Sequence, residues 1–494
     1  MTEHSGPRTA FDFRPGLTVL LGAAFGAALH PVWQLEARWL VIVVVAVVGV
    51  AVALMFTARL FDFLFVSLLA TLPFSAFLKW FAPAGLEGEA FGAAAYAGMA
   101  HIGLADFLLI GLFGAWALGF APPRPPAMDR RHWIDTAVIL LIIAHVVSII
   151  GVPDPALGIG AVLFVMKFAA YYYIISRHFM PRHVPWLTTA VLWSILIVSA
   201  IGLFQTFTGL GVGLALDKGA GGEALQTQYQ VPGIEYIARA TGTSYDSHAY
   251  GGFVGMLLML VLGSLLRPGQ PRHVVVVLIG FSLLAISAVV VSYSRSAYLS
   301  LALGLGVVIA AAAWRGEWRA VRILLVPILA VLPLAPWLLS RVIERFVTAP
   351  WEIMVARFEQ YEVAVDVWLA HPFFGFGAGN YMEALRIYNR DGFLELPVHN
   401  AMLWMLTESG VFGAACFFAI LFGAMFGYWR LFAARDPSVS WLALGGLGAL
   451  AVYFFDGLTH PLFREPTLFT FFWLLVGLLV AVQRHVAARK EMVT

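Results

Sequence analysis

The sequence has little charge and almost no cysteine. Only 12% of its 494 residues are charged, against the roughly 25% usual for a soluble domain. The single cysteine, Cys416, excludes an internal disulfide and a cysteine-based metal site. The scarcity of charge excludes an ordinary soluble domain, because such a domain needs a largely charged surface.

Motifs that bind nucleotides or metals are missing as well. The chain has no HExxH, no metal-spaced histidine pair, no P-loop, no GxGxxG that opens a helix after a strand and no Asp-x-Asp pair. Glu87 and Glu89 in "LEGEAF" are the nearest substitute for an acidic metal-binding pair. We therefore expect no cofactor and no metal.

Long apolar runs dominate what is present. The chain is 61% hydrophobic, with a mean hydropathy of +0.86, and runs of about 18 or more apolar residues recur along it. It is predicted to be an all-α polytopic membrane protein with about 12–14 transmembrane helices. The polar start "MTEHSGPRTAFDFRPG" has no signal-peptide pattern, so the first apolar segment is expected to remain as an anchor. The predicted spans are 17–31, 38–57, 60–80, 101–120, 134–153, 158–177, 186–206, 248–267, 273–293, 296–314, 321–340, 399–430, 440–459 and 466–483.

The distribution of arginine predicts the orientation of these spans. Cytoplasmic connections carry an excess of Lys and Arg, and the even-numbered connections together with both ends of the chain hold most of the arginine. We therefore expect both termini in the cytoplasm of a bacterial cell, with the chain in its inner membrane. The residues concerned are Arg124, Arg130, Arg131, Arg177, Arg182, Arg267, Arg272, Arg315, Arg319, Arg322, Arg430, Arg435, Arg484, Arg489 and Lys490.

With this topology two long connections, 207–247 and 341–398, face the periplasm. Connections this long usually have a function. Apolar residues at helical spacing in 351–371 predict an amphipathic helix on the outer membrane surface, and "FGFGAGN" after it predicts a glycine-rich turn. The chain thus divides into N-terminal helices 1–206, a periplasmic loop 207–247, helices 248–340 with a periplasmic turn at Arg295, a large periplasmic loop 341–398, and C-terminal helices with a cytoplasmic tail 399–494.

Two arginines lie on the side that the positive-inside rule leaves poor in positive charge. Arg295 is in "VSYSRSAYLS", between two spans, and Arg239 is in "ARATGTSYDSHAYGGF". Arg295 could extend its side chain to lipid headgroups and Arg239 could be an ordinary loop residue. Alternatively, both bind an anion: guanidinium groups suit phosphate oxygens, and two of them suit a diphosphate.

His399 and Asn400 stand at the start of the predicted span 399–430. The helix begins after Pro397, so its backbone N–H groups and dipole are expected to favour an anion. A histidine with a reference pKa near 6.5 can act as a base at neutral pH.

Glu408 follows nine residues later, about 13 Å deeper on the opposite side of the helix. It is therefore expected to be a buried carboxylate bonded to a neighbouring helix rather than a partner of His399. Lys167, in the span 158–177, also needs a partner, and Glu408 or Asp106 could serve.

Four stretches resemble the superfamily of O-antigen ligases and O-antigen polymerases, which are bacterial envelope enzymes. The resemblance covers about the C-terminal half, while the first 200 residues are similar only as a series of apolar helices. The family often has a proline–asparagine pair where this chain has Ser247 and His248, which leaves the role of His248 open. The stretches are "RATGTSYDSHAYGGF" (239–253), "SYSRSAYLSL" (292–301), "RFEQYEVAVDVWLAHPFFGFGAGNY" (357–381) and "HNAMLWMLTESGVFG" (399–413).

The resemblance implies a fold like that of C-type glycosyltransferases and transfer of a glycan from undecaprenyl diphosphate at the periplasmic face. It implies His399 as the catalytic base and Arg239 and Arg295 as diphosphate-binding residues. Asn400, His248 and Glu408 are expected to support them. A diphosphate is already a good leaving group, so base catalysis and electrostatic stabilisation are expected to suffice, with inversion at the anomeric carbon and no metal.

The acceptor stays open. A polymerase of O-antigen or exopolysaccharide repeat units would extend a second carrier-linked glycan, whereas a ligase would modify lipid A–core, and a protein O-glycan ligase is a third option. The long outer loops and the additional spans favour the polymerase slightly. Membrane lipid is an expected partner, nucleic acid is not, and a chain-length regulator stays open. The alternative from another class is a transporter or lipid flippase, in which Lys167 and Glu408 would carry the function.

Overall fold

The computed structural model describes most of the chain from residue 59 onward. The predicted spans 17–31 and 38–57 and the pair Glu87 and Glu89 lie outside the described residues. The described residues are 59–74, 77–80, 100–209, 228–231, 234–244, 246–331, 343, 351–388, 398–461 and 465–493.

Among these residues, nine helices are long and apolar enough to cross a membrane, which confirms the polytopic membrane fold. Each coincides with a predicted span to within a few residues, except that the last one continues to Val493. Two of the nine begin with a short 3-10 helix: η3 (Pro126–Asp129) precedes α6, and η4 (Pro181–His183) precedes α8. The nine helices are α6 (Trp133–Ser148), α7 (Pro155–His178), α8 (Val184–Thr208), α9 (Ser247–Leu265), α10 (Arg272–Val291), α11 (Arg295–Trp314), α16 (Ala401–Ala433), α17 (Ser440–Gly457) and α18 (Pro466–Val493).

The prediction of two full spans at 60–80 and 101–120 is wrong. The first contains only α3 (Leu60–Ala70, 11 residues) and the second only α5 (Leu104–Ala117, 14 residues). At 1.5 Å per residue they measure roughly 16 and 21 Å, short of the ~30 Å apolar core of a bilayer. An antiparallel pair of strands, β1 (Phe77–Trp80) and β2 (Ala100–Gly103), takes the place of the missing turns. Composition alone does not distinguish a half-length apolar helix from a full span.

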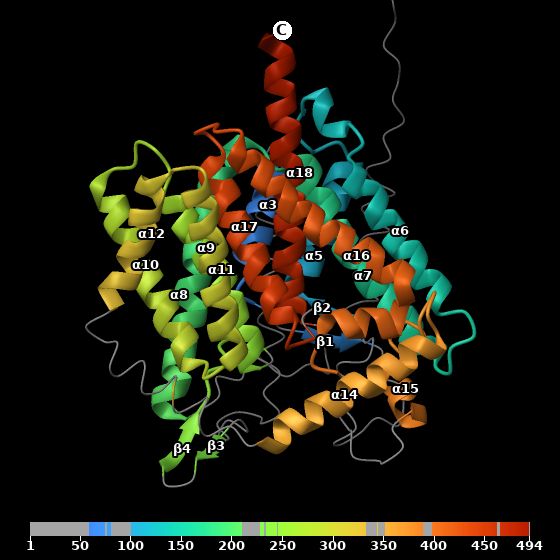
Figure 1. Ribbon diagram of the computed structural model, residues 1–494. Helices are drawn as coiled ribbons and strands as arrows, with labels where there is room; N and C mark the ends of the chain where they lie inside the picture. Colours follow the sequence, from blue (N-terminus) through green and yellow to red (C-terminus); the bar gives the residue numbers. More distant parts are fainter. Residues whose placement is uncertain are drawn as a thin grey trace, which may run out of the picture.

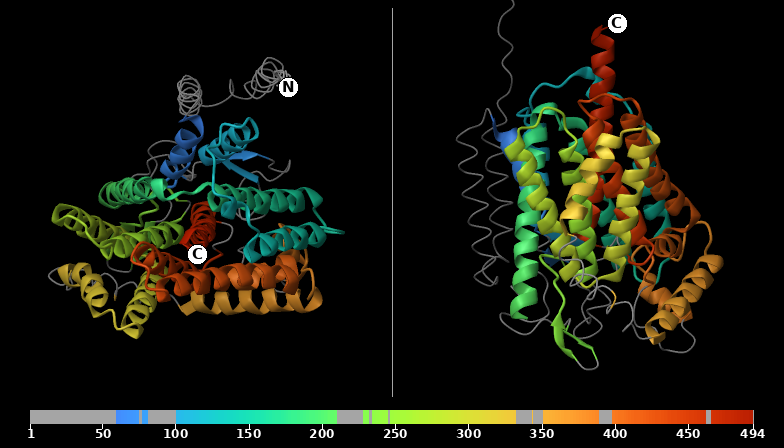
Figure 2. Two further views of the ribbon diagram at one scale, coloured as in Figure 1. Left: turned by 90° about the horizontal axis from the view of Figure 1, so that it is seen from above. Right: turned by 60° about the vertical axis from the view of Figure 1, so that its left-hand side comes forward.

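The helices form a bundle with two different ends (Figure 1). The C-terminus projects from one end. The opposite end, which we call the α14 end, carries the hairpin β3 (Gln228–Val231) and β4 (Ile234–Ala238), the oblique helix α14 (Trp351–Ala370) and the short α15 (Tyr381–Tyr388). In the view from above, α18 lies in the middle of the bundle (Figure 2). In the 18-residue apolar stretch of α18, 89% of the residues are buried. In that of α10, at the periphery, 39% are buried.

Helix α14 confirms the helix expected at 351–371, and its described side chains are divided between two faces. Gln360, Ala364 and Val367 are buried at the i, i+4, i+7 spacing of one helical face, and Phe358 and Leu369 are exposed on the other. The buried face packs against α16. In the predicted span 321–340, the structure describes α12 (Trp318–Val331).

The span predicted at 399–430 is one helix interrupted by a break. Gly410 has φ 61° and ψ −166°, a conformation almost restricted to glycine. The loop after α14 docks at this break, and a Cβ on Gly410 would lie 2.3 Å from the carbonyl of Phe373. The predicted glycine turn is confirmed, since Gly375, Gly377 and Gly379 all have positive φ. Four backbone hydrogen bonds join the loop to α16, and their N–H donors are Phe376, Gly377, Val411 and Phe412.

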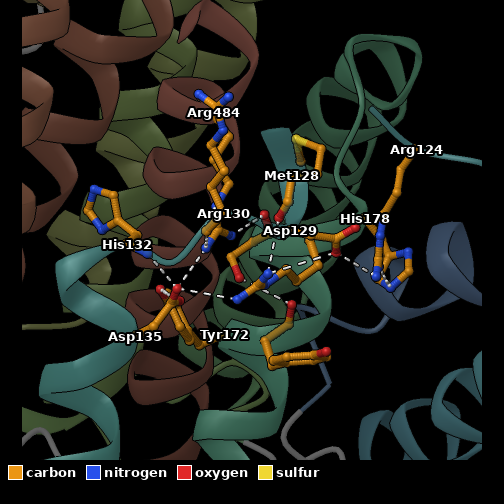
Figure 3. Close-up of polar contacts among 12 residues, drawn as sticks. Arg124, Met128, Asp129, Arg130, His132, Asp135, Tyr172, His178 and Arg484 are labelled. Atoms are coloured by element: carbon orange, nitrogen blue, oxygen red, sulfur yellow. Dashed lines mark hydrogen bonds and ion pairs between the residues drawn. The ribbon is translucent and has the colours of Figure 1, made fainter. Parts of the chain in front are cut away.

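Buried ion pairs join the helices at the C-terminal end (Figure 3). Asp135 of α6 accepts hydrogen bonds from Arg484 of α18 at 2.7 Å and from Arg177 of α7 at 3.3 Å. Arg484 also donates to the backbone carbonyl of Arg130 at 2.8 Å. These contacts tie α6, α7 and α18 together, so several of the arginines that predicted the orientation also hold this end of the bundle.

Candidate active site

His399 lies at the α14 end, where α14 contacts the start of α16. Its backbone N–H lies 3.4 Å and its Nδ1 3.0 Å from Oε1 of Gln360. The Tyr361 hydroxyl donates to the carbonyl of His399 at 3.4 Å. Because the backbone N–H is a donor, the Gln360 atom that it faces is an acceptor, and Nδ1 must then carry the imidazole proton. Nε2 is therefore the nitrogen that can accept a proton.

Asn400 caps the start of α16. Its Oδ1 accepts the N–H groups of Met402 and Leu403 at 2.9 and 3.0 Å, and its Nδ2 donates to the carbonyl of Leu458 at 3.1 Å. The expectation that these amide groups are open to an anion is therefore wrong, because a side-chain oxygen already occupies two of them. The helix dipole still points its positive end at His399.

Arg239 contacts the short turn between α10 and α11, and Arg295 directly follows this turn. Arg239 is 8% exposed, and its Nε donates to the carbonyl of Ser292 at 3.4 Å. Arg295 is the first residue of α11 and half-buried, directly after the N-cap Ser294. The loop after Arg239 is fixed from the other side by Gln205 of α8, whose Oε1 accepts the N–H groups of the two residues Thr241 and Gly242.

His248 connects this turn to His399. Its Nδ1 lies 2.7 Å from the hydroxyl of Ser294 and 3.1 Å from that of Ser296. The ring centroid of His248 is 5.2 Å from that of His460, and the ring of His460 is 6.3 Å from that of His399. His460 thus lies between His248 and His399. The tertiary structure thus gathers three histidines and the α10–α11 turn at the α14 end.

A cluster of acidic residues surrounds His460. Its Nε2 is 3.1 Å from Oδ2 of Asp246, while Oδ1 of Asp246 caps α9 by accepting the N–H of Ala249 at 2.7 Å. Ligand atoms of Asp246, His460 and Glu465 all lie within 4.8 Å of one another. Of the described residues, these three form the set whose geometry could hold a metal ion.

Burial and charge shift the pKa values of this cluster. Burial alone would lower the pKa of His460, but the ion pair and hydrogen bond with Asp246 outweigh it and raise the pKa to about 9. Burial raises the pKa of Glu465 to about 8, and the negative charge of Asp246 adds to the effect. The pKa of Asp246 stays below its usual range, because His460 outweighs the effect of burial.

Glu408 and Lys167 do not join this group of residues. Glu408 is buried two residues before Gly410, the break in α16. Its backbone carbonyl accepts the N–H of Gly377 at 3.2 Å. Burial, and the charge of Glu408 after it, raise the pKa of Tyr381 in α15. Of the two partners considered for Lys167, the structure selects Asp106, with Nζ 3.2 Å from Oδ2.

Sequence reasoning missed Gln360, Asp246, His460 and Glu465. Gln360 and Asp246 lie inside stretches that resemble the superfamily, but neither residue type stood out there. His460 and Glu465 belong to "THPLFRE", a short polar connection between two predicted spans. The available signal was that this connection is very short, carries several ionisable residues and lies on the side predicted to be periplasmic.

The fold and this cluster define a polytopic membrane protein with a polar site at one end of its helices. The family model described as "O-Antigen ligase" matches residues 280–418, which include Arg295, His399 and Asn400 but not Arg239 or His248. The chain thus carries a domain of the O-antigen ligase and polymerase superfamily, and the resemblance is confirmed. This match supports a membrane glycan-processing role of the ligase or polymerase type. Among curated proteins, none matches the chain.

Proposed function

We propose that this protein transfers a glycan from undecaprenyl diphosphate to an acceptor hydroxyl at the periplasmic face of the bacterial inner membrane. The α14 end would face the periplasm, because the opposite end carries the arginine-rich connections and the C-terminal tail. The observation that carries the proposal is the convergence of His399, Arg239 and the Arg295 turn on one end of the bundle, linked through His248 and His460.

His399 is the proposed base. The acceptor hydroxyl loses its proton to Nε2 while its oxygen attacks the anomeric carbon of the donor sugar. The bond from that carbon to the diphosphate oxygen breaks, so the configuration inverts. Gln360 supports this role, because it holds the proton on Nδ1 and orients the ring, as a positioning residue does for a general base.

Arg239 and Arg295 are the proposed ligands of the leaving diphosphate. Guanidinium groups stabilise the negative charge that develops on the diphosphate oxygens, and they do so more strongly where water is excluded. Burial of Arg239 supports this assignment. The positive end of the α16 dipole beside His399 would add to the stabilisation. His248 and Asn400 would support the site through the α10–α11 turn and the start of α16, respectively.

We favour a polymerase of O-antigen or exopolysaccharide repeat units over a ligase that joins the glycan to lipid A–core. The two long connections between spans support this preference, since the elements that they contain, α14, α15 and the β3–β4 hairpin, all lie at the α14 end (Figure 1). The ligase remains the alternative, since both reactions use the same donor and base. Transport by Lys167 and Glu408 is less well supported, because Lys167 is paired with Asp106 and neither residue belongs to the cluster around His399.

The test is a glycan analysis of the native host that lacks the gene and carries wild type, His399→Ala or the control His371→Ala. His371 is an exposed histidine at the end of α14. Carrier lipid, lipopolysaccharide and secreted polysaccharide are sized side by side. For a polymerase, His399→Ala removes long chains while single repeat units persist. Long carrier-linked chains with bare lipid A–core would identify a ligase, and wild-type glycans in His399→Ala would refute the proposal.

A further inference from the structure

Asp246, His460 and Glu465 come from two distant segments and meet at the α14 end. Asp246 precedes α9, and the other two lie in the connection between α17 and α18. We propose that these three side chains bind one divalent transition-metal ion of the Zn²⁺ class. The ion would hold the start of α9 to the α17–α18 connection, beside the three histidines.

The arrangement of donor atoms fits such an ion. Nε2 of His460 and Oδ2 of Asp246 are 3.1 Å apart, and all three ligand atoms lie within 4.8 Å of one another. Around tetrahedral zinc, ligand atoms about 2.1 Å from the ion lie roughly 3.4 Å from each other. Small rotations of the Glu465 side chain would therefore bring all three ligand atoms to the distances that zinc requires. One nitrogen with two carboxylate oxygens suits Zn²⁺ better than Mg²⁺ or Ca²⁺.

Glu465 distinguishes this cluster from a simple ion pair. Asp246 and His460 form an ion pair, and Glu465 beside them is only 3% exposed, while Nδ1 of His460 is buried without a hydrogen-bond partner among the described residues. Its oxygen nevertheless lies within the 4.8 Å cluster. Two buried carboxylates this close are stabilised either by a proton on one of them or by a cation between them, and a bound metal ion would supply the cation.

The surrounding charge points the same way. Asp456, at the end of α17, is fully buried and acts electrostatically on both Asp246 and His460. Three carboxylates thus surround one imidazole. A divalent ion would balance this charge. Oδ1 of Asp246 would still accept the N–H of Ala249. Hydrogen bonds of this kind usually orient the side chains that bind a metal.

The site goes beyond the proposed glycan transfer, to which it contributes no chemical step. Its expected effect is on the stability of the α14 end, because the ion would join segments separated by more than two hundred residues of sequence. Metal binding can therefore be measured whether or not the transfer reaction is the one proposed.

The experiment uses the full chain, purified in detergent with a tag that contains no histidine. It is stripped with a chelator, loaded with Zn²⁺, Mn²⁺ or Mg²⁺, desalted, and analysed for metal by mass spectrometry. We expect about one Zn²⁺ per chain in the wild type and at least a tenfold weaker affinity in Glu465→Gln, as for loss of a ligand. Glu408→Gln, which removes a buried carboxylate elsewhere, should bind like the wild type.

A thermal melt of the same samples supplies the second readout. Zn²⁺ should raise the melting temperature of the wild type and of Glu408→Gln but not that of Glu465→Gln. Glu465→His, which keeps a zinc ligand at the position, should restore binding and guards against a variant that simply fails to fold. A wild type that retains no Zn²⁺ or Mn²⁺ above background, or Glu465→Gln with unchanged affinity, would overturn the inference.

Discussion

Gln360 and His399 are linked through a single oxygen atom. Oε1 of Gln360 lies 3.0 Å from Nδ1 of His399 and 3.4 Å from its backbone N–H. The contact joins the middle of α14 to the residue before the N-cap of α16, across 38 intervening residues. It defines which imidazole nitrogen carries the proton, and this is the property on which a histidine base depends.

Removing that contact should slow the reaction without unfolding the protein. We expect Gln360→Ala to lower kcat by about 10- to 100-fold with little change in KM, because the ring loses its orientation and its tautomer. Glu359→Ala, an exposed neighbour on α14, is the matched control and should keep full activity. The rates would be measured with lipid-linked donor and purified acceptor. Equal rates for the two variants would remove Gln360 from the site.

Two substitutions of Asn400 distinguish the effect of helix capping from the effect of charge at the start of α16. Aspartate caps a helix about as well as asparagine, but Asn400→Asp loses the hydrogen bond to the carbonyl of Leu458 and should cost about 1 kcal/mol of stability. It also places a negative charge next to His399, which should lower activity at least tenfold if a diphosphate binds there. Asn400→Ala loses both the cap and this hydrogen bond and should cost about 2 kcal/mol of stability. Full activity of a stable Asn400→Asp variant would argue against an anion at this position.

The break in α16 depends on glycine at position 410. Gly410→Ala would require a conformation that L-residues avoid and would place a Cβ 2.3 Å from the Phe373 carbonyl. The loss should be about 3 kcal/mol or more, as expected for combined backbone strain and steric clash. Gly306→Ala is the control, since a Cβ in that part of α11 meets no atom within 4 Å. A melting temperature equal to that of the control would mean that α16 can straighten.

Lys167 and Asp106 should behave as a coupled pair. Lys167→Met leaves a buried carboxylate in α5, and breaking a buried pair in this way costs about 3–5 kcal/mol. The double variant Lys167→Met with Asp106→Leu should recover much of that loss, because no isolated charge remains. Stability is read from detergent-solubilised melts. Additive losses would contradict the pairing. Loss of glycan function in a stable double variant would favour the transport alternative.

The sequence was most reliable where the physical requirement is local. An apolar run of about 20 residues must be helical in lipid, so the long spans from α6 onward were predicted to within a few residues. The glycine turn at 375–379 was predicted for a similar reason, because only glycine readily adopts positive φ. Arg295 directly follows the short α10–α11 turn, as the first residue of α11, close to where it was expected.

Failures occurred where the outcome depends on partners that are distant in sequence. The half-length helices α3 and α5 are as apolar as full spans. The cap provided by Asn400 uses the amide groups that were expected to bind an anion. The choice of Asp106 over Glu408 as partner of Lys167 depends on which helices are neighbours, and hydropathy does not encode that choice.

The sequence by itself determined that this protein crosses a membrane, which end of its helices carries the positive charge, and which superfamily it resembles. It did so because lipid solvation and charge act on each segment separately. Only the tertiary structure decided that Gln360 orients His399, that His248 and His460 link His399 to the arginine-bearing turn, and that Asp246, His460 and Glu465 form one cluster. These contacts join the ends of helices that are far apart in the chain, so they exist only once the helices have packed.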